Sequence, residues 1–176
     1  KPEEVAALAI APPSLETALL RTGGAKEILL ANGFKKENIF EAPWTGAVDI
    51  ASASDAANAV LTAHGNFKKW VVFSSNDDGV LGGIRAISNR NIGPDSIIGV
   101  GINGPLAAQE WAKRQPTGMF ASVMLQPKAH GADTVEAMFK WIKEGKEPAK
   151  ETYTSGKVMT KDTYKTLMAE QGLKAP

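Results

Sequence analysis

Two asparagines in this chain each come directly after a short apolar run. Val71-Val72-Phe73-Ser74-Ser75 leads into Asn76, Ile97-Ile98-Gly99-Val100-Gly101-Ile102 leads into Asn103, and a helix pattern follows each one. In an open α/β sheet, ligands bind at the carboxyl ends of the strands, where neighbouring loops converge. Because an Asn side chain offers both a donor and an acceptor, the pair predicts a neutral ligand rich in hydroxyls, with a sugar as the first candidate.

Two further side chains are candidates for the same site. Arg21 lies in the second turn of the first predicted helix, where a solvated face or a helix salt bridge is the simpler explanation. Trp44 is the only aromatic residue in a predicted carboxyl-end loop, so it is a candidate to cover the apolar face of a sugar; a surface or interface Trp is the alternative. For Asn76 and Asn103 the alternative is a turn or a helix cap.

Catalytic and metal chemistry find little support. His64 and His130 are the only histidines, and neither has a carboxylate or Ser partner at an informative spacing, so we expect no catalytic residue. The run Asp77-Asp78-Gly79 lacks the alternating ligands of a calcium loop, and a helix cap at Asp77 or Asp78 explains it better. With no Cys in the chain, thiolate sites are excluded, and we expect no metal.

One glycine motif has the spacing of a dinucleotide-binding loop. Gly99-x-Gly101-x-x-Gly104 follows a strand pattern and precedes a helix pattern. The fingerprint belongs to the first unit of a Rossmann half, with an acidic residue about 20 positions further on. Here it lies in the fourth unit, and the stretch around Met124 has no acid. We therefore expect no nucleotide cofactor, and the motif supports only a minor alternative, a dinucleotide-dependent dehydrogenase.

Composition describes a chain of single-domain size without a nucleic-acid signature. The sequence has 176 residues, with 20 Lys and Arg against 19 Asp and Glu. This near balance gives no basic surface for a phosphate backbone, so no nucleic-acid partner is expected. No apolar run approaches the roughly 20 residues that a membrane span needs.

Strand and helix patterns alternate along the chain, which predicts a parallel sheet with helices on both faces, an α/β fold. A helix that begins at Ser14 and ends at Asn32-Gly33 follows the first strand. The remaining predicted helices span about 49–64, 78–88, 106–114, 127–144 and the region after a cap at Thr160. The predicted strands are 5–10, 39–42, 70–74, 97–101, 120–125 and about 152–159.

Several segments resemble one family in particular. They include Asn76-Asp77-Asp78-Gly79-Val80-Leu81-Gly82-Gly83, the run from Ile97 to Gly104, Leu15-Glu16-Thr17-Ala18-Leu19-Leu20-Arg21, Asp55-Ala56-Ala57-Asn58 and Val158-Met159-Thr160-Lys161-Asp162. Together they resemble the periplasmic L-arabinose-binding proteins of bacterial ABC sugar importers over nearly the whole chain. Many wider relatives have Asp where this chain and the arabinose type have Asn, at Asn103.

The resemblance implies a flavodoxin-like lobe of a type I periplasmic sugar-binding protein that performs no chemistry. It implies that Arg21, Asn76 and Asn103 hydrogen-bond the ring oxygen and hydroxyls of a monosaccharide, with Thr17 and Ser75 around them. Ser75 stands where the arabinose type has Met, so the pocket for the sugar is expected to differ in shape.

The resemblance also implies how the chain is divided. The family has two lobes, and residues 1–126 match its second, C-terminal lobe. Residues 127–146 match a helix that belongs to the first lobe, and residues 147–176 match the return crossover, strand and helix of the second. The implied partners are a monosaccharide and the membrane permease of an ABC importer, in the periplasm, and the unpaired apolar stripe of 127–144 predicts self-association. A LacI-type effector-sensing domain is the alternative with the same fold, although the helix-turn-helix that it needs is absent from this sequence.

Overall fold

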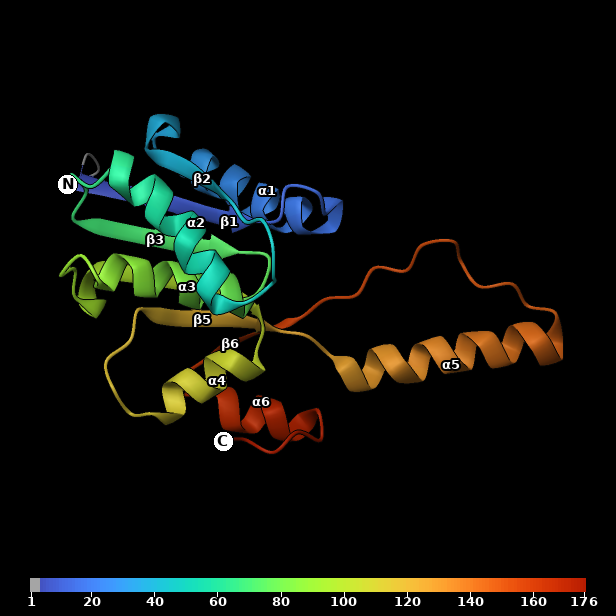
Figure 1. Ribbon diagram of the computed structural model, residues 1–176. Coiled ribbons are helices and arrows are strands. Elements are labelled where there is room, and N and C mark those ends of the chain that lie inside the picture. The colour runs from blue at the N-terminus through green and yellow to red at the C-terminus, as the bar shows by residue number, and fades with distance from the viewer. Residues whose placement is uncertain (1–3) are drawn as a thin grey trace.

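The computed structural model describes residues 4–176 and consists of a six-stranded sheet with helices on both faces (Figure 1). The strand order is β2-β1-β3-β4-β5-β6, in which all neighbours are parallel except β5 and β6. The predicted α/β flavodoxin-like class is confirmed. The first three residues of the predicted second lobe lie outside the described residues. The strands are β1 (Val5–Ala11), β2 (Ile39–Pro43), β3 (Lys69–Ser74), β4 (Ile97–Asn103), β5 (Met119–Met124) and β6 (Lys157–Thr160).

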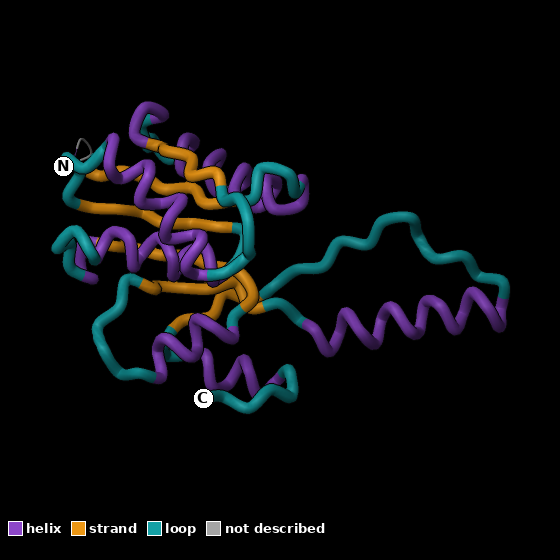
Figure 2. Tube along the Cα trace, viewed as in Figure 1, coloured by secondary structure: helices purple, strands orange, loops and turns teal. Residues whose placement is uncertain are grey.

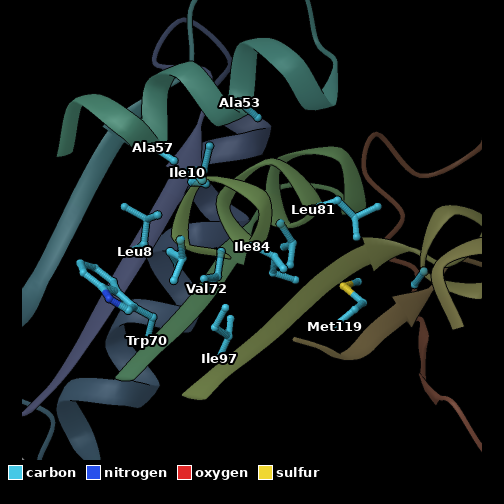
Figure 3. Packing of buried hydrophobic residues seen from close by; sticks show 14 of the residues in the cluster. Leu8, Ile10, Ala53, Ala57, Trp70, Val72, Leu81, Ile84, Ile97 and Met119 are labelled. Carbon is cyan, nitrogen blue, oxygen red and sulfur yellow. The ribbon is translucent and has the colours of Figure 1, made fainter. Parts of the chain in front are cut away.

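Alternating residues of the strands face two different helix layers. On one face, Leu8, Ile10 and Val72 pack with α2 (Ile50–Ala63) and α3 (Asp77–Ser88) in the main core (Figure 3). On the other face, Ala7, Ala9 and Phe73 pack with residues of α1 (Glu16–Ala31). Burial of both faces explains why these strands are apolar throughout.

Two glycines let α3 approach its neighbours closely. A Cβ on Gly82 would lie 2.6 Å from the Cβ of Ala53 in α2, and one on Gly83 would lie 2.7 Å from Val72 Cγ1 in β3. The absence of side chains at these two positions therefore lets α3 pack directly on both α2 and the sheet.

The C-terminal half begins with α4 (Pro105–Ala112) and ends with α6 (Tyr164–Glu170), which meet where Trp111 and Tyr164 lie with ring centroids 5.9 Å apart. Between them, α5 (Pro127–Glu144) extends away from the sheet, and the loop of 145–156 returns beside it (Figure 2). No residue of α5 is buried, and Val135, Phe139 and Ile142 are 70%, 57% and 74% exposed. An apolar stripe of this kind can be covered by self-association or by the helix folding back over its own lobe, and the second of these does not occur in this structure.

Several element boundaries differ from the sequence prediction. The first helix has Leu15 as its N-cap residue and no side-chain cap, so the predicted cap at Ser14 is wrong. The last strand begins only at Lys157, because the preceding residues lie in the extended return segment. The last helix follows Thr163, whose hydroxyl accepts a hydrogen bond from the amide of Thr160 at 2.9 Å, so the predicted cap at Thr160 is also wrong.

We predict that Gly83→Ala lowers the free energy of unfolding by about 1–3 kcal/mol, because the added methyl overpacks the contact with Val72 and Ile10. Urea unfolding followed by far-ultraviolet circular dichroism measures the change. Gly24→Ala is the matched control, since nothing lies within 4 Å of its Cβ position. The control should raise stability by up to about 1 kcal/mol. Equal effects of the two variants would show that α3 does not need its close approach.

Candidate functional site

The carboxyl ends of β3 and β4 place the two predicted asparagines side by side. Phe73 of β3 is aligned with Val100 of β4 in the parallel register. Asn76 and Asn103 each come three residues after this aligned pair. The two residues therefore reach the same edge of the sheet at the same level, and both are half-buried.

Asn76 has a structural role as well as a place at this edge. It is the N-cap residue of α3, and its Oδ1 accepts a hydrogen bond from the amide of Gly79 at 3.0 Å. The prediction that Asp77 or Asp78 caps this helix is wrong, because the cap lies one residue earlier. With Oδ1 committed to the helix, the Nδ2 amide is the part of Asn76 that is available to donate to a ligand.

Arg21 connects α1 to the same edge. Its Nη1 donates a hydrogen bond to the main-chain carbonyl of Ser75 at 2.8 Å, across 54 positions of sequence. The Ser75 side chain is buried, whereas Thr17, one helical turn before Arg21, is exposed on α1. Arg21, Ser75 and Asn76 thus lie together, which leaves further guanidinium donors of Arg21 for a ligand.

Asn103 ends β4 in an unusual backbone conformation. Its φ is 120° and the φ of Gly104 is 105°, so two successive residues lie in the region that favours glycine. A Cβ on Gly104 would lie 2.3 Å from the sulfur of Met124. For Asn103, a positive φ costs on the order of 1–3 kcal/mol and persists only where surrounding contacts enforce it.

A buried carboxylate beneath this edge supplies such contacts. Asp77 is fully buried, and its Oδ2 accepts from the amides of Gly104 at 2.9 Å and Ala107 at 3.3 Å. Its Oδ1 accepts from the hydroxyl of Ser122 at 2.6 Å. Burial raises the pKa of the Asp77 carboxyl above its ordinary value, and the three hydrogen bonds oppose that rise.

Sequence reasoning missed this role of Asp77. One signal was available: α4 begins with Gly104 and Pro105, so the helix has no side chain of its own that can cap its first amides. An acceptor from another segment is then required. The neighbouring acidic residue Asp78 is less deeply placed, and partial burial also raises the pKa of its carboxyl.

Trp44 does not belong to the site. It is 2% exposed and lies in the main core, where its indole nitrogen donates to the carbonyl of Ala47 at 3.0 Å. Both interpretations of this residue, a cover for a sugar face and a surface tryptophan, are wrong. A large aromatic side chain next to the sheet stabilises the fold more by burial than it would in an exposed loop.

The glycines of the dinucleotide-like motif are explained by packing. A Cβ at Gly99 would lie 2.7 Å from Ile84 Cδ1, and one at Gly101 would lie 2.2 Å from Asp77 Oδ1. Gly104 meets Met124 in the same way. Each glycine therefore makes room for a neighbouring side chain of the core, which removes the support for a phosphate-binding loop.

Of the predicted polar residues, Arg21 and Thr17 are exposed to solvent, and Asn76 and Asn103 are half-buried. A cavity of about 540 Å³ lies elsewhere, between α1 and the ends of β1 and β2, and is lined by Ala11, Leu19, Thr22, Lys26 and Pro43 among others.

Within residues 4–176, no group of three or more His, Cys, Asp or Glu side chains is placed to hold a metal ion. None of the helices in that range has the length and apolar character of a membrane span.

Two known proteins with similar sequences are L-arabinose-binding periplasmic proteins. An ABC transporter L-arabinose-binding periplasmic protein from Azospirillum brasilense is 46% identical over 174 residues, which are 98% of this chain and 52% of that protein. The L-arabinose-binding periplasmic protein of Escherichia coli K12 is 38% identical over 97% of this chain and 52% of its own length. The resemblance predicted from the sequence is confirmed, and the chain spans about half the length of these relatives. No protein-family model matches the sequence.

Solved structures of periplasmic binding proteins share the fold. A periplasmic ribose ABC transporter protein from Conexibacter woesei superposes with a TM-score of 0.74 at 24% identity, over 94% of this chain and 54% of that one. The periplasmic binding component of the arabinose ABC transporter from Shewanella sp. ANA-3 gives 0.71 at 21% identity, over 96% of this chain and 55% of the other. At these identities the likeness concerns the fold alone.

We predict that the stability of the protein relative to Asp77→Asn depends on pH. Because the pKa of Asp77 is raised in the folded state, the protonated carboxyl favours folding, and this contribution is lost as pH rises above the ordinary value near 3.8 through the raised value. The free energy of unfolding should therefore fall relative to that of the Asn variant over this window. Urea unfolding of both proteins at a series of pH values measures it, and a constant difference would contradict the prediction.

Proposed function

We propose that this chain, whose sequence matches half of the L-arabinose-binding periplasmic proteins, is the C-terminal lobe of the sugar-binding component of an ABC importer. In this role it captures L-arabinose or a related aldose in the periplasm and delivers it to the membrane permease, with no chemical step. The observation that carries the proposal is the hydrogen bond from Arg21 to the Ser75 carbonyl, because it brings α1 to the edge where Asn76 follows β3 and Asn103 ends β4.

The residues at this edge suit the recognition of hydroxyls. Arg21 presents a rigid fork of donors to a ring or hydroxyl oxygen. The Nδ2 of Asn76 adds donors, and Asn103 offers one donor group and one acceptor, so a hydroxyl that donates and accepts can be matched. Ser75 and Thr17 are the small polar residues around these three. A neutral sugar brings no charge of its own into the site, so its binding does not require an ionic partner.

The proposed division of the chain follows the same comparison. Residues 1–126 and 147–176 form the lobe, and residues 127–146 form a helix that belongs with a first lobe. The absence of any buried residue in α5 supports this assignment. A site completed by a second lobe would enclose the sugar and exclude water, which the open edge of this chain does not do.

We predict that the chain binds L-arabinose with a dissociation constant in the millimolar range or weaker, because water competes for the sugar at an open half-site. A millimolar constant corresponds to a binding free energy of about 4 kcal/mol in magnitude. Titration of the ¹⁵N-labelled chain should shift the amide signals of Asn76, Asn103 and Gly104. Asn103→Ala should remove these shifts while α3 keeps its cap. NAD is the negative control, and shifts that appear with NAD but not with L-arabinose would favour the dehydrogenase alternative and overturn the proposal.

We also propose that the chain self-associates through α5, because Val135, Met138, Phe139 and Ile142 form an exposed apolar stripe on this helix, and soluble monomers rarely expose large contiguous apolar patches. Sedimentation velocity should show a dimer whose fraction rises with concentration. The double variant Met138→Asp and Phe139→Asp should be monomeric. Lys128→Asp with Lys143→Asp is the control, since it changes charge on the same helix without removing apolar area. A protein that stays monomeric at high concentration contradicts this proposal.

A further inference from the structure

The Asp77 carboxylate connects three segments that carry the proposed sugar site. It belongs to the first residue of α3, directly after Asn76. Its oxygens bind amides at the start of α4 and the Ser122 hydroxyl in β5. A single buried side chain therefore links the end of β3, the end of β4 and the middle of β5.

The bond to Gly104 acts on the peptide unit that follows Asn103. The amide of Gly104 and the carbonyl of Asn103 belong to one rigid plane, so fixing the amide direction fixes ψ of Asn103. Asn103 is also held at a φ of 120°, which a non-glycine residue leaves readily when its neighbours allow it. The hydrogen bond thus opposes relaxation of the residue that is to meet the sugar.

The Asp77 carboxylate is closely surrounded by protein. A Cβ at Gly101 would lie 2.2 Å from Asp77 Oδ1, so the carboxylate packs directly on the backbone of β4. The side chain is fully buried, and its two oxygens accept three hydrogen bonds from β5 and the start of α4. One hydrogen bond, from the Gly104 amide to Asp77, therefore connects the residue after Asn103 to the residue after Asn76.

We propose that Asp77 is the positioning residue of the sugar site, which holds the Asn103 side chain in register with Asn76. The inference rests on the proposed function, since it names what makes the two asparagines act as a pair. Asp77 itself is buried beneath the edge and does not touch the ligand. Its effect on binding is transmitted through the peptide between Asn103 and Gly104.

Two substitutions separate hydrogen bonding from burial. Asp77→Ala removes every acceptor, whereas Asp77→Asn is isosteric: its carbonyl oxygen can accept from Gly104 and Ala107, and its amide can donate to the Ser122 oxygen. Ile87→Ala is the control for general loss of stability, because Ile87 is fully buried at the far end of α3. Urea unfolding shows which variants are comparably destabilised.

The test has one readout without ligand and one with L-arabinose. In the ligand-free, ¹⁵N-labelled chain, Asp77→Ala should change the HN–Hα coupling of Asn103 towards the value of an extended residue and speed amide exchange at Gly104. Asp77→Asn and Ile87→Ala should leave both unchanged. In titrations, Asp77→Ala should weaken L-arabinose binding at least tenfold, and Asp77→Asn should restore it to within about threefold of the parent.

The outcomes distinguish the inference from the proposed function. If the parent chain shows no response to L-arabinose, the proposed function fails, while the coupling and exchange data still decide whether Asp77 holds Asn103. If the parent binds and Asp77→Ala binds equally well, or Asp77→Asn fails to rescue, the positioning role is overturned. Should Asp77→Ala not fold, Ser122→Ala removes one bond to the carboxylate and is expected to give a smaller loss of the same kind; no loss in a folded Ser122→Ala would also overturn it.

Discussion

The parallel register of β3 and β4 is the constraint on which the site depends. The carboxyl ends of parallel strands all lie at one edge of the sheet. Residues that are far apart in the sequence therefore meet there without long connecting loops. Asn76 and Asn103 lie equally far past the aligned pair Phe73 and Val100. Once that register is formed, the hydrogen bond from Arg21 to Ser75 adds α1 to the same edge. A slip of one residue would turn one of the asparagines towards a helix layer.

Close packing and polar bonding converge on the same segment of β4. Gly99 and Gly101 have no side chain because α3 and the Asp77 carboxylate occupy that space. Burial disfavours the charged form of this carboxylate, and the donors from Gly104, Ala107 and Ser122 compensate for part of that cost. The compensation also satisfies amides at the start of α4 that would otherwise lack acceptors. Fold stability and the geometry of the edge therefore rely on one group.

Much of this architecture could be predicted from the sequence because its signals are local. Alternating apolar runs of strand length and helical periodicities predict the order of the elements and the fold class. Helix ends were less accessible: Asp77 looks like a cap, yet Asn76 one residue earlier takes that position. Trp44 was misjudged because the main core extends past the end of β2, which only tertiary packing reveals. The role of Asp77 depends on contacts across 27 and 45 positions, and no local pattern specifies them.

For helix α5, too, the sequence predicts the local structure but not the tertiary contacts. Pro127 at its start, the ion pair of Glu136 with Lys140, and Gly145 in the left-handed region at its end are all local signals, and the helix formed within the predicted limits. Its apolar stripe, by contrast, is typical of a helix face that packs against other protein, and the pattern does not identify what would cover it. In the proposed sugar site, Arg21, Asn76 and Asn103 likewise lie at an open edge and would contact a ligand from one side only. Under the proposed function, a second lobe packed on α5 would lie next to the carboxyl ends of the strands, because α5 follows β5 at that edge of the sheet.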